Sequence, residues 1–198
     1  MTMKTQWVVS AKVLALSLVL LGIVYPLVIF VAGRALFPFR AGGSLIREGN
    51  RVLGSDLIAQ DFSLPGYFQP RPSACSYDST SSGGSNLAAT SAKLLEVYWE
   101  RIRKLRLANP LEEVQVPLEL VAASASGLDP DISLGAALWQ LPRVAQARSL
   151  PRERIEELVR KNVRPPLFGF VGEWRVNVFE LNRRLDRLPP EGEANKNE

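Results

Sequence analysis

The stretch VLALSLVLLGIVYPLVIFVAG, residues 13–33, decides the organisation of this 198-residue chain. It contains no charged side chain, and a helix of its length, at about 1.5 Å per residue, crosses a hydrocarbon core of about 30 Å. A cleaved signal peptide is the competing interpretation, but its apolar region usually has only about 7–15 residues and ends in a small-residue cleavage site. VAGR does not resemble such a site. We therefore predict an uncleaved N-terminal transmembrane helix in contact with membrane lipid.

The rest of the chain is organised around this helix. A short tail, residues 1–12, precedes it, and a neck rich in Gly, Arg and Ser follows at residues 34–54. Helical and strand-like patterns mix over residues 55–188 without an internal repeat, which indicates one domain. The polar residues 189–198 have the composition of a disordered tail. The expected fold class is α/β or α+β, with a single N-terminal transmembrane helix followed by one mixed extracytoplasmic domain.

Hydrophobic spacing predicts the main elements of that domain. Apolar residues recur at helical intervals over about residues 90–108, 133–147 and 152–162. WRVNVFEL, residues 174–181, alternates between apolar and polar side chains, which is typical of a half-buried strand. A short closing helix is expected over residues 182–188.

Composition excludes several classes of chemistry. The chain has no histidine and one cysteine, Cys75, so it cannot form a Ser-His-Asp triad, a His-ligated metal site or an intrachain disulfide. From Arg34 onward it carries 22 basic and 20 acidic residues, a balance that argues against nucleic acid as a partner. It contains no phosphate-binding GxxxxGK[ST] loop, no DKTGT phosphorylation sequence and no TVGYG filter. We expect no catalytic residue and no metal site.

Two loops remain as candidate sites. SSGGSN, residues 81–86, contributes Ser82, Gly83, Gly84, Ser85 and Asn86. Such a loop before a helix can cradle phosphate with its backbone N–H groups, but it holds no lysine, and an ordering turn is the favoured interpretation. SGLDPDIS, residues 126–133, is either a turn with a helix N-cap at Asp129 or Ser133, or a contact surface.

Four segments, taken together and in order, resemble one protein family. They are YPLVIFVAGRALFPFRAGGSL (25–45), YFQPRPSACSYDSTSSGGSNL (67–87), VPLELVAASASGLDPDIS (116–133) and WRVNVFELN (174–182). The chain resembles the KdpC family, the C subunit of the bacterial Kdp potassium-transporting ATPase, from the transmembrane helix to about Leu188.

The resemblance implies a non-catalytic accessory subunit of a high-affinity, ATP-driven K+ import complex. Its expected role is assembly and stabilisation of the complex with an ion-conducting subunit, a P-type ATPase subunit and a small single-span subunit. The alternative is a catalytic chaperone that raises the ATP affinity of the ATPase subunit through a transient ternary complex with nucleotide. No cofactor of its own is implied, and ATP enters only through the complex.

The resemblance also implies a location in the inner membrane, with a cytoplasmic N-terminus and an external C-terminal domain. The positive charges that follow the helix mildly favour the opposite orientation, although long domains translocate largely regardless of charge. Asp131 stands where family members commonly have histidine. The segments quoted above and the predicted helix over residues 133–147 supply the candidate interface residues, Tyr77, Asp129, Pro130, Gln140, Arg143, Arg175 and Asn177.

Overall fold

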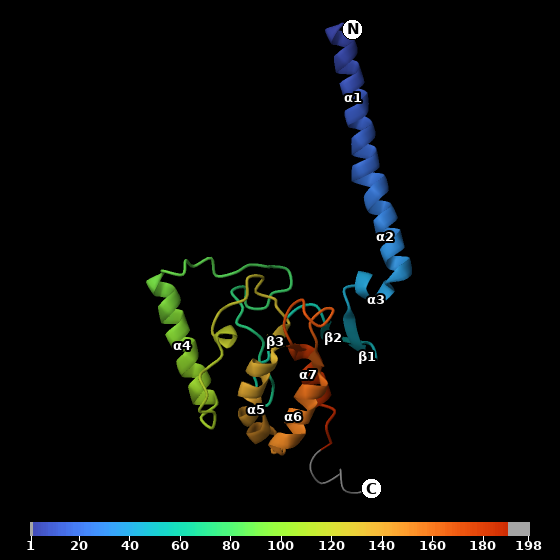
Figure 1. Ribbon diagram of the computed structural model, residues 1–198. Helices are drawn as coiled ribbons and strands as arrows, with labels where there is room; N and C mark the ends of the chain where they lie inside the picture. Colours follow the sequence, from blue (N-terminus) through green and yellow to red (C-terminus); the bar gives the residue numbers. More distant parts are fainter. Residues whose placement is uncertain (1, 190–198) are drawn as a thin grey trace. The chain divides into compact units, whose positions relative to one another are not determined.

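The computed structural model describes residues 2–189 and divides into two units between Leu45 and Ile46 (Figure 1). All but the first residue of the tail expected over residues 189–198 therefore lies outside the described residues.

The first unit is dominated by a long helix. It consists of α1 (Met3–Val19), a π-helical turn (Leu20–Val24) and α2 (Tyr25–Leu36), which follow one another without a break (Figure 1). None of its residues is buried, and by length and composition it is suited to cross a membrane. The helix begins ten residues before the uncharged stretch, so most of the N-terminal tail is helical.

The π-helical turn lies next to the only proline of this helix. Tyr25 N–H donates to the carbonyl of Leu20, five residues earlier. Pro26 has no N–H with which to continue the α-helical pattern, and a π-helical turn is one of the adjustments that accommodate such a loss. The helix consequently continues to Leu36 before the short helix α3 (Pro38–Ala41).

The second unit begins inside a hairpin in the region assigned to the neck, one residue after the hairpin starts. Strands β1 (Leu45–Glu48) and β2 (Arg51–Ser55) form a two-stranded sheet. Gly49, between them, has φ +57°, in the left-handed region that glycine adopts without a steric penalty.

The central sheet of the domain has three short strands in the order β3-β5-β4. They are β3 (Asp131–Ser133), β5 (Arg175–Asn177) and β4 (Val163–Arg164), and β5 is antiparallel to both neighbours. Val176, at the centre, pairs with Ile132 on one side and Val163 on the other. An antiparallel sheet with segregated helices makes the domain α+β.

The three predicted helices of the domain are confirmed, each within two residues at either end. They are α4 (Ala92–Ala108), α5 (Leu134–Arg148) and α6 (Arg152–Lys161). Helices α5, α6 and α7 (Val178–Leu185) pack together beside the sheet (Figure 1). Their apolar faces form one core with residues of the strands and of the segment before α4: Phe68, Ile132, Val144, Ile155, Val159, Val176, Val178, Leu181 and Leu185.

The strand predicted over residues 174–181 is wrong beyond Asn177. The Asn177 side chain accepts a hydrogen bond from the Glu180 N–H at 3.0 Å and caps α7, so the helix starts four residues before its predicted beginning. Glu180 lies in the first turn and pairs with Arg183 and Arg184, which suits the positive end of the helix dipole. An Asn followed three residues later by Glu is a helix-start pattern that outweighs the short alternation.

Candidate functional site

The two candidate loops are 44 residues apart in sequence and lie against each other in the domain. The backbone N–H of Gly83 donates to the carbonyl oxygen of Ser126 at 2.9 Å, and Ser82 Oγ donates to the same oxygen at 3.0 Å. SSGGSN and SGLDPDIS therefore form one paired-loop site.

Gly127 lies at the tightest point of this paired-loop site. It is buried, with φ +69°. A Cβ built on Gly127 would lie 2.5 Å from Cys75 Sγ and 2.7 Å from the carbonyl oxygen of Gly83, so no other residue fits without displacing its neighbours. Cys75 Sγ is 3.6 Å from the Gly127 carbonyl oxygen, to which it donates. The single cysteine thus packs inside the site.

Ser73 organises the turn that holds Cys75 and Tyr77. Its Oγ accepts hydrogen bonds from the backbone N–H of Cys75 at 3.1 Å and of Tyr77 at 2.9 Å. The Tyr77 hydroxyl donates to the carbonyl of Arg71 at 3.0 Å. The pKa of Tyr77 is raised to about 12, mainly because the phenol is buried and, to a smaller extent, because the carboxylate of Asp61 is near. Tyr77 therefore stays protonated and acts as a hydrogen-bond donor inside the fold.

The glycines of SSGGSN do not form a left-handed phosphate cradle. Neither Gly83 nor Gly84 has positive φ; Asn86 takes that conformation instead, with φ +53°. A Cβ on Gly84 would lie 3.1 Å from the Ala125 carbonyl oxygen, whereas one on Gly83 would meet open space. Gly84 thus serves the close approach of the two loops. With the Gly83 N–H already bonded, this geometry favours the ordering turn.

A row of ion pairs lies beside the paired-loop site and along the sheet. Within the SGLDPDIS loop, the side chain of Asp129 accepts a hydrogen bond from the N–H of Asp131 at 3.2 Å. The Pro130 carbonyl accepts one from the N–H of Val178 at 2.9 Å, and this bond ties the loop to α7. The pairs, with their shortest N–O distances, are Arg71–Asp129 at 3.1 Å, Arg175–Asp131 at 3.0 Å and Arg164–Asp56 at 3.1 Å.

The N-cap of α5 is Ser133. Its Oγ accepts the N–H of Ala136 at 3.1 Å, and both its N–H and its hydroxyl donate to Glu119. Of the two predicted caps, Ser133 fills the role, and Asp129 stabilises the preceding turn instead.

Asp131 is partly buried, and burial is the main influence on its pKa. Its Oδ2 pairs with Arg175 and its Oδ1 is buried, while the amide of Asn177, its partner residue in the sheet, donates to the carbonyl of Asp56 at 3.0 Å. Burial raises the pKa of Asp131 above its ordinary value, and the opposing charges of Arg175 and Arg164 do not fully offset it. Asn177 is itself 2% exposed, so both of its roles are internal.

Gln140 and Arg143, two further interface candidates, are also buried and clamp a loop. Gln140 Oε1 accepts the Gln69 N–H at 2.8 Å, and its Nε2 donates to the Gln69 carbonyl at 3.0 Å. Arg143 donates to the carbonyls of Pro65 and Tyr67, and burial lowers its pKa to about 10. The remaining interface candidates, Tyr77, Asp129, Pro130 and Arg175, are partly or fully exposed.

Asn182 is an important residue that sequence analysis missed. It is 1% exposed; its Oδ1 accepts the Phe68 N–H at 2.9 Å and its Nδ2 donates to the Phe68 carbonyl at 2.8 Å. Asn182 and Gln140 thus bond the backbone N–H and carbonyl groups of two consecutive residues, Phe68 and Gln69, as a neighbouring β-strand would. The sequence did contain a signal for it, since Asn182 lies on the same helical face as Val178 and Leu185. A polar side chain on a buried face needs a hydrogen-bond partner inside the protein.

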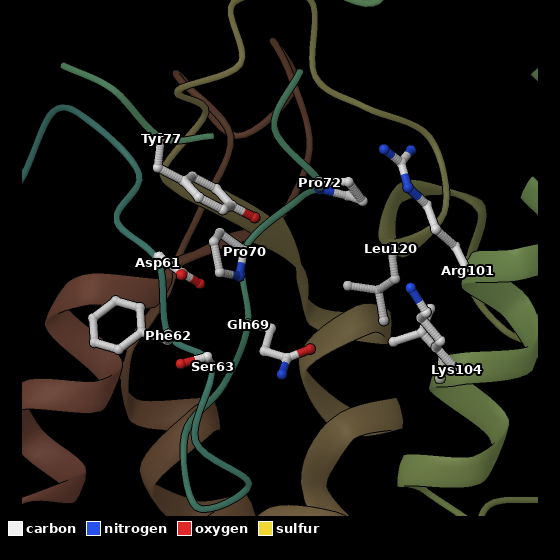
Figure 2. A pocket seen from close by; sticks show the side chains of 11 residues that line it. Asp61, Phe62, Ser63, Gln69, Pro70, Pro72, Tyr77, Arg101, Lys104 and Leu120 are labelled. Atoms are coloured by element: carbon white, nitrogen blue, oxygen red, sulfur yellow. The ribbon is translucent and has the colours of Figure 1, made fainter. Parts of the chain in front are cut away.

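A cavity of about 580 Å³ separates α4 from the loops that precede it in sequence. Arg101 and Lys104 line one wall, and Asp61 lies opposite them (Figure 2). Arg101 donates to the Val121 carbonyl at 2.7 Å, and Lys104 pairs with Glu100 at 2.6 Å. Both cations are thus engaged, and the facing carboxylate disfavours a polyphosphate. Within residues 2–189 no group of three or more His, Cys, Asp and Glu side chains could hold a metal ion.

The fold defines a class of protein: one N-terminal helix suited to span a membrane, followed by an α+β domain whose polar loops are bonded to each other. Residues 7–187 match the family model described as KdpC, K+-transporting ATPase, c chain. The chain is 49% identical over 174 residues to the potassium-transporting ATPase KdpC subunits of Escherichia coli (strain K12) and Shigella dysenteriae serotype 1 (strain Sd197), covering 86% of this chain and 92% of each relative.

The chain belongs to the KdpC family, which confirms the predicted resemblance. Members of this family are the C subunit of the multi-subunit K+-transporting ATPase, and this chain is therefore one of its subunits.

Proposed function

We propose that this chain is a non-catalytic accessory subunit that assembles and stabilises a high-affinity K+ import complex. Its partners would be an ion-conducting subunit, a P-type ATPase subunit and a small single-span subunit. The observation that carries the proposal is the paired-loop site. Its hydrogen bonds are made internally, while an outer rim of small side chains remains exposed: Ser82, Ser85, Asn86, Ala125 and Ser126.

This rim has the properties of a contact surface. Small side chains allow the backbone of a partner to approach closely and lose little rotamer freedom on binding. The bonds from Ser82 and Gly83 to Ser126 hold both loops before a partner arrives, which reduces the entropy lost on association. A preformed surface whose Gly83 N–H and Ser82 hydroxyl are already bonded to Ser126 supports a role in subunit contact more than one in nucleotide binding.

The assembly role predicts a specific effect of bulk on the rim. Ser85→Arg and Ala125→Arg are expected to reduce the recovery of complete complex severalfold, because a long charged side chain prevents close approach. Co-purification of the subunits in mild detergent measures the effect. Ser79→Arg, at an exposed position outside the rim, is the matched control and should leave recovery unchanged.

The same complexes distinguish the alternative role. If the loop instead assists nucleotide binding, Ser82→Ala and Ser85→Ala would raise the apparent KM for ATP while the complex remains intact. That result, or normal recovery of the two arginine variants, would contradict the assembly proposal.

We further propose that the N-terminus is cytoplasmic and that the domain lies outside the inner membrane. Lys4 and Lys12 precede the apolar stretch without any acidic residue, which suits a cytoplasmic N-terminus. Protease added to intact spheroplasts is expected to digest the domain and to leave a membrane-embedded N-terminal fragment. Protection in spheroplasts, together with digestion in inverted membrane vesicles, would reverse the orientation.

A further inference from the structure

The connection between β4 and β5 exposes an unusual amount of apolar surface. We call residues 165–174 the aromatic loop. Phe168 and Phe170 are 81% and 80% exposed, and their ring centroids lie 6.5 Å apart. Three further apolar side chains are at least half exposed, Leu167, Val171 and Trp174. A contiguous apolar patch of this kind marks an interaction with protein or membrane.

The backbone of the aromatic loop is already hydrogen-bonded within itself. Leu167 and Val171 exchange two N–H···O bonds of 2.9 Å each, and Gly169 N–H donates to the Pro166 carbonyl at 3.0 Å. The Phe170 N–H donates to the carbonyl of Leu167 at 3.3 Å. Unpaired backbone groups are the main obstacle to placing non-helical chain in an apolar medium, and the bonds between Pro166 and Val171 reduce it at the tip of this loop.

The conformation of Phe168 indicates that its exposure is functional. Phe168 has φ +55°, where a bulky side chain is a rare outlier, and Gly169 and Gly172 have φ +82° and +101°. Gly or Asn would adopt this left-handed backbone conformation at position 168 at a lower energetic cost than Phe. An aromatic ring held outward in a strained position is a feature that function, more than folding, explains.

Charge and connectivity identify the occupant. Residues 165–172 carry no charge, while Arg164 and Arg175 flank the base of the loop and pair with Asp56 and Asp131. Asp56 directly follows β2 and lies only 20 residues along the chain from Leu36, the end of the membrane helix. The base of the loop is therefore bonded to a residue that follows the membrane helix closely in sequence. Apolar residues at a tip, with Trp174 at the charged boundary, match the profile of a membrane interface.

We propose that the aromatic loop inserts into the interfacial region of the lipid bilayer and forms a second membrane contact of the domain. Phe168 and Phe170 enter the apolar side of the interface, and Trp174 lies at the level of the headgroups. The contact limits rotation of the domain about its neck. It is independent of the paired-loop site and of the assembly role proposed above.

Lipid-borne quenching of tryptophan tests this proposal in the full chain. The chain is placed in nanodiscs of phosphatidylcholine and phosphatidylglycerol, with or without bromine on the acyl chains. Subtracting the emission of Trp174→Phe isolates the Trp174 signal. Subtracting that of Trp99→Phe isolates Trp99, which is 65% exposed on α4 and serves as the matched control. We expect brominated lipid to quench Trp174 and dissolved acrylamide to quench Trp99.

A double variant tests the role of the tip. Phe168→Asn with Phe170→Asn preserves the left-handed preference at position 168 and should abolish the lipid quenching of Trp174. Equal behaviour of Trp174 and Trp99 in both quenchers would overturn the proposal. Shielding of Trp174 only in the assembled complex, without lipid quenching of the chain alone, would also overturn it and assign the loop to a protein partner.

Discussion

Replacing Asn182 by leucine is expected to cost several kcal/mol of domain stability, because it leaves the buried N–H and carbonyl of Phe68 without partners. Both groups bond only to the Asn182 amide among the contacts described for them, and Phe68 is completely buried. Each unpaired buried group costs roughly 1–3 kcal/mol, against a total stability of about 5–15 kcal/mol for a typical protein. The midpoint of thermal unfolding should fall by about 10 °C or more.

Near-ultraviolet circular dichroism of the full chain in detergent follows this transition. Arg184→Leu is the matched control on the same helix, since it removes only an exposed pair with Glu180, and such pairs contribute about 0–1 kcal/mol. If Asn182→Leu melts together with Arg184→Leu, the amide clamp is not essential to the domain.

Gly127→Ala is expected to separate the two loops of the paired-loop site. The added Cβ would come within 2.7 Å of both Cys75 Sγ and the Gly83 carbonyl oxygen, closer than carbon atoms tolerate. The left-handed backbone alone costs alanine roughly 1–2 kcal/mol. We expect new protease cleavage between residues 73 and 86, together with a loss of complex assembly like that expected for the rim variants.

Two further variants divide this effect into its causes. Gly49→Ala meets the same backbone penalty at φ +57° but open space, so it should be markedly milder. Cys75→Ala removes the nearest obstructing atom and should partly restore Gly127→Ala. If Gly49→Ala is as damaging, or if Cys75→Ala gives no rescue, steric contact is not what makes Gly127 necessary.

The elements that were predicted correctly have strong local signals. Helices α4, α5 and α6 follow from apolar spacing and from start signals such as Ser133, which depend only on neighbouring residues. The short strands of the central sheet lack this information. Val163 and Val176 become paired because helices fold against them, and no pattern of two or three residues predicts a partner. The error at Asn177 came from weighing alternation above capping.

The candidate site was predicted by composition but not by contact. The sequence singled out both SSGGSN and SGLDPDIS, yet the bonds from Ser82 and Gly83 to Ser126 span more than 40 residues. Gln140, on the predicted helix over residues 133–147, was a candidate interface residue, and polar side chains are exposed on average. The structure instead buries it against Gln69. A polar side chain on an apolar helix face is ambiguous until its partner segment is known.

The amide clamps have a consequence for the conditions in which the domain can work. Asn182 and Gln140 hold the loop at Phe68 and Gln69 with neutral groups that neither gain nor lose a proton. The chain has no histidine, the side chain that ordinarily titrates between about pH 5 and 8. In the orientation proposed above, the domain would meet whatever acidity the medium imposes. The two amide clamps are therefore expected to keep their hydrogen bonds through mild acidification.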